Sequence, residues 1–329
     1  MNFGFAEIGG NFEANEAQFK SKTEITTLEM KCGNSGIFSG VIFAGTVSFA
    51  DASFVDLIID DIPLSAGPVP ELDLTRCSIK RLLHIDRIRV KDLLASSLHV
   101  EGPASFIGAT IEHSADLSYS NFLTLDLSDS VWPKEGGDFN MRGMSYKYVR
   151  AASGDERDSH QALLTLADQS AYTADTYSNL EDFFLRQGYR DDANQAFVAG
   201  KRHERREHLH GLGWIGSWLL DWLVGYGRHP WQAGIPCLFF VAFGCLLFSK
   251  EKMERQKPEE VKESEGPLRG YSRLWYSLGL FLPFVDLKSD RVWKPKDDQR
   301  FLRHYMRVHI LLGWILIPIL LAAISGLIK

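Results

Sequence analysis

Large apolar residues recur at intervals of five in the N-terminal part of the sequence. The clearest run places them at Leu117, Phe122, Leu127 and Trp132, and a small or aliphatic residue stands two positions before each one. A period of five fits neither a helix, which repeats every 3.6 residues, nor a strand, which repeats every two. It is typical of a chain that turns a corner after every five residues and points the central residue of each side into a shared core. The pattern predicts a β-solenoid with four sides in each coil.

This five-residue register extends over most of the sequence before Trp132. Several steps carry six residues instead of five, and the register weakens toward the N-terminus at Phe19, Ile25 and Met30. The other core positions that it predicts are Phe38, Phe43, Phe49, Phe54, Ile59, Leu64, Leu74, Ile79, Ile85, Val90, Ala95, Val100, Phe106 and Ile111. We therefore expect a β-helix repeat domain over residues 1–150, with an ordinary β-sheet protein as the alternative.

The pattern becomes helical after about Ser153. Apolar residues with helical spacing fill 158–169, then 175–187, where Gly188 is a natural C-terminal stop, and then a third stretch from about Asp191 to His208. The last two helices resemble one hairpin of a tetratricopeptide-like unit. A single hairpin cannot form a solenoid of its own, so we interpret residues 151–210 as a helical connector.

Two long uncharged stretches follow in the C-terminal third of the chain. Residues 231–249 contain no charged side chain, and residues 308–328 contain none apart from His309 near their start. Each is about as long as the roughly 20 residues that a helix needs to cross the hydrocarbon core. The sequence predicts two membrane-spanning helices there; a buried helix of a large soluble core is the alternative for the first.

Two shorter apolar segments complete a predicted membrane domain over residues 211–329. Residues 214–224 contain three tryptophans downstream of basic residues, which favours a helix lying in the lipid interface. Residues 271–287 are apolar but too short to cross easily, and Pro283 interrupts them, so a re-entrant or interfacial helix is expected.

The repeat and the C-terminal layout both resemble known families. Ala115-Asp-Leu-Ser-Tyr119 is similar to the Ala-(Asp/Asn)-Leu-x-x motif of pentapeptide-repeat proteins, and the resemblance covers roughly residues 7–132. It implies a right-handed quadrilateral β-helix.

Residues 177–329, above all the segment 276–287, resemble bacterial membrane proteins in which β-helix repeats precede an ion-channel-like pair of helices. That resemblance implies a multi-pass protein of the bacterial inner membrane. Relatives are sometimes labelled oxidoreductases, a label that no residue here supports.

The N-terminus and the basic residues give opposite predictions of topology. Residues 1–7 have neither a basic start nor an apolar run, so a secretory signal is not predicted and the N-terminal domain is expected in the cytoplasm. The positive-inside rule favours the reverse. Seven basic residues flank the loop between the predicted spans, against Arg228 and Lys329 on the other side: Lys250, Lys252, Arg255, Lys257, Arg300, Arg303 and Arg307. We follow the missing signal, because the N-terminal domain is synthesised before any span.

Two glycine-rich motifs match functional signatures only by letter. Gly211-Leu-Gly-Trp-Ile-Gly216 matches the dinucleotide fingerprint, but a charged helix end precedes it where the fingerprint needs a strand. Leu223-Val-Gly-Tyr-Gly227 is similar to the potassium-channel filter, but it precedes the first predicted span and lacks the filter threonine. We expect instead a tight interfacial turn formed by Gly225, Tyr226, Gly227 and Pro230.

The remaining chemistry is sparse. Four cysteines, Cys32, Cys77, Cys237 and Cys245, form no metal-like pair and are expected to be reduced thiols. The N-terminal domain carries a basic cluster (Arg76, Lys80, Arg81, Arg87, Arg89, Lys91) and an acidic patch (Asp51, Asp56, Asp60, Asp61). We interpret both as solvated faces, and we expect no catalytic, cofactor, metal or nucleic-acid site. Ser277, Pro283 and Asp286 are the candidate pore or membrane-hairpin residues, since a carboxylate near a membrane hairpin can line an aqueous path.

Three functions are consistent with these patterns. The leading hypothesis is a cytoplasmic β-helix sensor or scaffold on a pore-forming, ion-channel-like two-span domain. Two spans cannot enclose a pore, so this hypothesis requires a homo-oligomer in the lipid bilayer. The second is a membrane-tethered scaffold without a pore, whose β-helix binds a cytoplasmic protein partner. The third is a membrane-associated oxidoreductase, which rests only on Gly211–Gly216.

Overall fold

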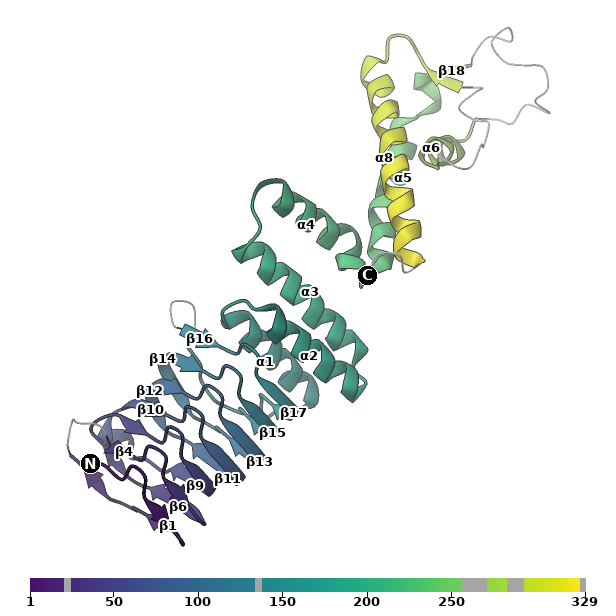
Figure 1. Ribbon diagram of the computed structural model, residues 1–329. Coiled ribbons are helices and arrows are strands. Elements are labelled where there is room, and N and C mark those ends of the chain that lie inside the picture. Colours follow the sequence, from purple (N-terminus) through teal and green to yellow (C-terminus); the bar gives the residue numbers. More distant parts are fainter. Residues whose placement is uncertain (21–24, 134–137, 256–270, 283–292, 326–329) are drawn as a thin grey trace. The chain divides into compact units, whose positions relative to one another are not determined.

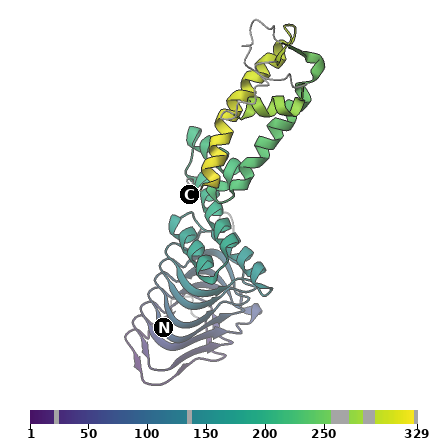
Figure 2. The same cartoon turned by 90° about the vertical axis from the view of Figure 1, so that its right-hand side faces the viewer.

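The computed structural model describes residues 1–20, 25–133, 138–255, 271–282 and 293–325. The chain divides into two compact units, Met1–His208 and Leu209–Lys329. We call the first the solenoid unit and the second the helical unit, and we describe each by itself (Figures 1 and 2).

The solenoid unit is a β-solenoid of about six turns, followed by three helices. One parallel sheet has the strand order β1-β5-β9-β11-β13-β15-β17, and a second has β4-β8-β10-β12-β14-β16, so sequence-distant strands stack one coil on the next (Figure 1). Val90, for example, pairs with Val69 in the coil before it and with Ile111 in the coil after it. The bounds are β1 (Glu7–Ile8), β2 (Phe12–Glu13), β3 (Gln18–Phe19), β4 (Ile25–Thr26), β5 (Lys31–Cys32), β6 (Ser35–Ser39), β7 (Ile42–Phe43), β8 (Val47–Ser48), β9 (Ser53–Asp60), η1 (Leu64–Ala66), β10 (Val69–Asp73), β11 (Ser78–Asp86), β12 (Arg89–Leu94), β13 (His99–Ser105), β14 (Thr110–Asp116), β15 (Asn121–Asp126), β16 (Asp138–Asn140) and β17 (Ser145–Arg150).

Burial follows the predicted five-residue register. Phe49, Ile79, Leu117 and Phe122 are at most 1 % exposed, and the residue two positions before a central one, such as Ala115, is buried with it. All the predicted core positions from Phe38 to Ile59, and all those from Leu74 to Trp132, carry buried side chains. The prediction of a β-solenoid with these inward positions is confirmed.

The corners of each coil differ from the prediction. Tight turns with a left-handed residue come at about every second corner, at Arg76, Arg87, Ser97, Gly108, Tyr119 and Asp129. The corners between them are bends inside continuous strands, with register shifts after Ile79, Val90 and Val100. A bulge adds one residue to one strand of a pair. The six-residue steps Ile79–Ile85, Val100–Phe106 and Ile111–Leu117 lie at such bends.

The recurring aspartate of the repeat caps these tight turns. The carboxylates of Asp73, Asp116 and Asp126 accept a hydrogen bond from the backbone N–H two residues on, at 2.9–3.0 Å. The next residue then takes the left-handed conformation. Such side-chain to backbone bonds favour turns over continued strands. This explains why the sequence repeats Asp-Leu-Ser or Asp-Leu-Thr at the ends of strands.

Three helices cover the β17 end of the solenoid (Figures 1 and 2). They are α1 (Glu156–Gln169), α2 (Ala174–Gln187) and α3 (Arg190–Glu207). Gly188 caps the C-terminus of α2, and its φ of 88° matches its predicted role as a stop. Their apolar faces continue the solenoid core: the rings of Tyr146 and Phe183 lie 5.3 Å apart, and the Asn179 side chain donates to the carbonyl of Met144. The helices thus shield the last coil from water.

The helical unit contains α4 (Gly211–Val224), η2 (Gly225–Gly227), η3 (Pro230–Ala233), α5 (Gly234–Leu247), η4 (Lys250–Lys252), β18 (Met253–Arg255), α6 (Arg273–Phe281), β19 (Trp293–Pro295) and α8 (Arg300–Ile324). β18 and β19 pair antiparallel. Two buried clusters hold α5, α6 and α8 together. One joins Cys237, near the start of α5, to Leu316 of α8, and the other joins Phe248, just after α5, to Leu302 of α8. α5 therefore runs antiparallel to α8 along its whole length.

Among the described residues, one helix is long and apolar enough to cross a membrane, where the sequence predicts two. It is the part of α8 from Arg300 to Ala322. The predicted span 231–249 forms α5, whose 14 residues reach about 21 Å, against a hydrocarbon core of about 30 Å. Pro230 begins a short 3-10 helix in place of the first α-helical turn, and Phe248 leaves the helical conformation. The predicted segment 271–287 contains the nine-residue α6. The last five residues of this segment, 283–287, lie outside the described ranges.

Candidate functional site

The glycine turn at the end of α4 reverses the chain before α5. Gly225, Tyr226 and Gly227 all have positive φ, of 52°, 52° and 87°. Glycine adopts this conformation readily, whereas tyrosine does so only when its surroundings hold it. The Tyr226 ring is buried, and its hydroxyl lies 2.7 Å from Ser217 Oγ of α4. A filter of stacked carbonyls needs a different backbone, so this segment is a turn. Pro230 begins η3.

Ser277 lies where α5, α6 and α8 meet, and it is completely buried. Its hydroxyl donates to the carbonyl of Val241 at 2.8 Å and lies 3.3 Å from Nε2 of His309, which is also completely buried. A Ser–His pair can form a nucleophile in hydrolases. Here the serine hydroxyl donates to a backbone carbonyl and both side chains are buried, so the pair joins the three helices.

His309 is satisfied on both ring nitrogens. Nε2 lies 3.1 Å from the carbonyl of Ser277, and Nδ1 lies 3.2 Å from the hydroxyl of Tyr305. An imidazole with its proton on Nε2 can donate to that carbonyl and accept from that hydroxyl at the same time. We call Ser277, His309 and Tyr305 the polar crossing. Polar groups inside an apolar helix bundle are costly unless they are paired in this way.

Two glycines let the helices approach closely at this crossing. A Cβ added to Gly244 of α5 would overlap Ser277 Oγ, and one added to Gly313 of α8 would overlap the backbone carbonyl of Phe281. Small residues of this kind are typical of helix contacts in membranes. Of these residues, only Ser277 was predicted from the sequence; Gly244, His309 and Gly313 were not. A histidine and glycines inside otherwise apolar segments were the available signal.

Pro283 and Asp286, the other two candidate pore residues, lie outside the described residues. Ser277 is therefore the one member of the predicted set whose surroundings can be stated. In this arrangement its own chain encloses it on all sides, and a pore-lining role for the set stays a prediction.

The helical unit exposes large apolar side chains over long helix faces. On α5 they are Ile235, Leu238, Phe239, Phe243 and Leu246, and on α8 they are Phe301, Val308, Leu311, Trp314, Ile315, Leu321 and Ile324. Leu238 is 73 % and Leu311 is 59 % exposed. Monomeric soluble proteins rarely leave contiguous apolar patches of this kind in water. These faces need a cover that is itself apolar.

Three arginines of the basic cluster pair with three aspartates of the acidic patch of the solenoid. Residues one coil apart pair with each other: Arg76 with Asp51 through two bonds of 2.6 Å, Arg81 with Asp56, and Arg87 with Asp61 at 2.8 Å. His84 lies 3.6 Å from Asp60. The sequence shows these charges as two separate groups because they are a coil apart along the chain. In space they form a ladder of mixed sign.

Acid is expected to weaken this ladder. The hydrogen-bonded guanidinium of Arg81 holds the pKa of Asp56 below its usual range, against the opposing effect of burial, and Arg76 does the same for the pKa of Asp51. A carboxyl with a lowered folded pKa contributes stability that is present above its unfolded pKa of about 4 and is lost as pH falls through the folded value. The thermal unfolding midpoint of Arg81→Met should therefore be lower than that of the wild type at pH 7. The difference between the two midpoints should vanish as the pH is lowered.

The control for this experiment is Lys80→Met, which removes a neighbouring exposed lysine and should leave the pH profile unchanged. A constant gap between Arg81→Met and wild type at every pH would contradict the assignment.

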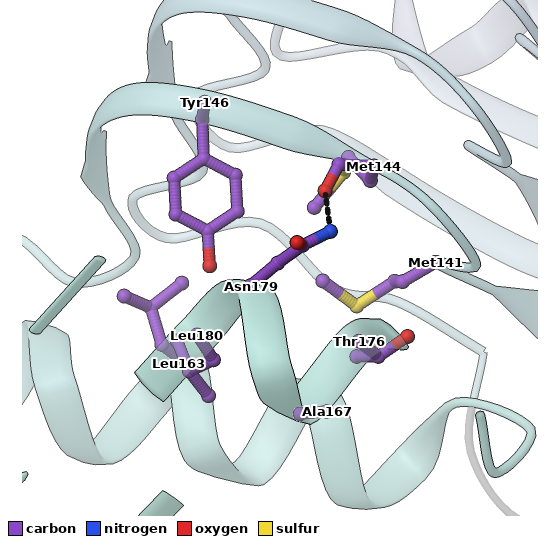
Figure 3. A pocket seen from close by; sticks show the side chains of 8 residues that line it. All are labelled: Met141, Met144, Tyr146, Leu163, Ala167, Thr176, Asn179 and Leu180. Atoms are coloured by element: carbon purple, nitrogen blue, oxygen red, sulfur yellow. Dashed lines mark hydrogen bonds between the residues drawn. The ribbon is translucent and has the colours of Figure 1, made fainter. Parts of the chain in front are cut away.

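The solenoid unit has a small cavity between its last coil and the helices that cover it. The cavity measures about 10 Å³, and Met141, Met144, Tyr146, Leu163, Ala167, Thr176, Asn179 and Leu180 line it (Figure 3). It can hold at most one water, whereas ligand pockets measure about 300–1,000 Å³.

The described ranges also contain no group of three His, Cys, Asp or Glu side chains that could hold a metal ion. Gly211–Gly216 begins α4 directly after α3, without the strand that a dinucleotide fingerprint needs.

In comparisons with known proteins, no family model, no curated protein and no solved structure matches this chain. The resemblance to pentapeptide-repeat and channel-like membrane proteins therefore stays a prediction.

Proposed function

We propose that this chain is a membrane-anchored scaffold, in which the helical unit is embedded in lipid and carries the β-solenoid as an interaction surface. The exposed apolar faces of α5 and α8 are the observation that carries the proposal. Exposed apolar helix faces are sufficient for a membrane anchor, because lipid chains can cover them without any specific polar contact. The solenoid supplies long, charge-balanced strand faces, which suit recognition of an extended protein partner.

The finer features of the fold belong to the same proposal. We take the solenoid as a right-handed quadrilateral β-helix related to pentapeptide-repeat proteins, because two of every five residues point inward. We take α5, extended at its start by η3, as a second crossing beside α8, since the two helices stay in contact from end to end. The bilayer would have to thin locally around α5, at a modest cost for each ångström of mismatch.

We place the solenoid on the cytoplasmic side of a bacterial inner membrane. The native thiols cannot test this topology, because Cys32 and Cys77 are buried in the solenoid core and would be shielded on either side. Burial also raises the pKa of the Cys77 thiol to about 12, which further lowers its reactivity. The exposed positions Lys91, in the solenoid, and Glu251, after α5, are suitable instead.

In intact cells, Glu251→Cys should react with an impermeant thiol reagent and Lys91→Cys should not. After the cells are opened, both should react. If Lys91→Cys is labelled in intact cells and Glu251→Cys is not, the topology is reversed and the positive-inside count is correct. If neither is labelled in intact cells and both are labelled after the cells are opened, Glu251 does not reach the outside and the membrane crossing itself is wrong.

A pore formed by several copies is the second candidate. The order of a helix, the short helix α6 and the long helix α8 is the observation that favours it, because simple pores share this layout. Copies would meet through the exposed faces of α5 and α8. Conductance in a planar bilayer, together with oligomers in mild detergent, would support this candidate over the plain anchor, and monomers without conductance would remove it.

A further inference from the structure

Within the described part of the helical unit, the buried residues of α4 lie at its C-terminal end. Leu223 and Val224 are buried in a cluster with Ala233 and Cys237, at the start of α5, and with Leu316, in the last third of α8. This cluster lies at one end of the antiparallel α5–α8 pair. If that pair crosses a membrane, the attachment point of α4 is at the level where the helices leave the lipid.

The turn after Val224 fixes the direction in which α4 leaves this point. Three successive residues with positive φ reverse the chain, and the Tyr226 hydroxyl bonds Ser217, two helical turns back in α4. A Cβ on Gly225 would meet the ring of His229. The helix is thus held by its own turn and is not a loose extension.

The surface of α4 combines tryptophan with aliphatic residues. Trp214, Trp218 and Trp222 are four residues apart, each about half exposed, and the rings of Trp218 and Trp222 lie parallel with centroids 6.2 Å apart. Leu212, Ile215, Leu219 and Leu220 are exposed as well. Asp221 is the one charged residue in the sequence of α4, which contains no lysine or arginine.

We propose that α4 lies in the lipid interface, at the membrane surface where α5 begins and α8 ends. Indole rings favour this layer, because their apolar body faces the acyl chains while the N–H reaches water or headgroups. Since α4 has no cationic side chain, its partner is the interface of a zwitterionic lipid, and anionic headgroups are not needed. This inference rests on the proposed function, because it takes α8 as a crossing helix.

Depth-dependent quenching of the full-length protein in phosphatidylcholine vesicles tests the inference. The substitutions Trp214→Phe, Trp218→Phe and Trp222→Phe are combined in one variant, and the fluorescence that they remove is the signal of α4. Lipids brominated near the headgroup should quench that signal at least about twofold more strongly than lipids brominated near the chain ends. The ratio should not change when anionic lipid is added.

Other outcomes overturn the inference. Stronger quenching by the deep bromines would mean that α4 inserts across the lipid. Absence of quenching at either depth would mean that water, a second copy or another protein covers it. A requirement for anionic lipid would also contradict the proposal. A bimane probe on Gly216→Cys, where the structure leaves open space, repeats the measurement if the triple variant does not fold.

Trp314→Phe separates this inference from the proposed function. Trp314 is exposed near the middle of α8, so the fluorescence removed by this substitution should be quenched most by the deep bromines. If Trp314 is quenched and the α4 tryptophans are not, the anchor is correct and the placement of α4 is wrong. If neither is quenched, the anchor fails as well.

Discussion

Phe122→Ala should lower the free energy of unfolding of the solenoid unit by about 3–5 kcal/mol, the usual cost of truncating a fully buried phenylalanine. Phe122 is 1 % exposed, and its strand β15 lies between β13 and β17, so its neighbours in the register are Val100 and Tyr146. Continuous coils on both sides limit how far the site can collapse, and a cavity should remain. Urea unfolding of the detergent-solubilised full chain, followed by far-UV circular dichroism, measures the effect.

The next residue on the same strand is the matched control. Leu123 points outward and is 42 % exposed, so Leu123→Ala should change the free energy of unfolding by no more than about 0.5 kcal/mol. The pair tests the inward positions directly, because a shift of one residue would exchange the two side chains. Similar losses for both variants would show that the assigned register is wrong.

Gly313→Ala should destabilise the helical unit by about 3 kcal/mol, the upper end of the usual range for overpacking. The new methyl group would overlap the backbone carbonyl of Phe281, which cannot move without displacing α6. Displacing α6 also pulls Ser277 away from His309 and Val241. Heat-induced loss of helical circular dichroism, in detergent micelles, should shift to lower temperature.

Gly216→Ala in α4 is the matched control, and it should stabilise the helical unit instead of destabilising it. A Cβ at Gly216 meets nothing within 4 Å, so alanine should stabilise the helix by up to about 1 kcal/mol through its higher propensity. If both variants are stabilised, α8 and α6 do not approach each other at Gly313 and the packing of the helical unit is wrong.

The solenoid was the most predictable part of the fold, because burial repeats on a fixed period. Once Leu117 and Phe122 set the register, the inward positions of the neighbouring coils followed. The form of the corners could not be predicted in this way. The bulge after Ile79 appears in the sequence only as a six-residue step, which does not distinguish a bend inside a strand from a tight turn. The pairing of Arg76 with Asp51 was also missed, because partners one coil apart carry no local signal.

The helical unit was less predictable. Composition identified the apolar stretches, but the length of a helix also depends on its ends, and α5 ends at Leu247, two residues before the uncharged stretch does. The partners of Ser277 come from α5 and α8, and only the tertiary arrangement brings Val241 and His309 to it. Sequence singled out the serine for a possible aqueous path, and the structure places it in a packed crossing.

We propose that lipid covers the faces of α5 and α8 while water surrounds the solenoid. Spin labels at Leu238 and Leu311 of the reconstituted protein, with Leu123 as the reference, test it by electron paramagnetic resonance. Oxygen, which dissolves in lipid, should relax the labels at Leu238 and Leu311 more than a water-soluble nickel chelate does, and the label at Leu123 should show the reverse. Equal access of the nickel chelate to all three positions would contradict it.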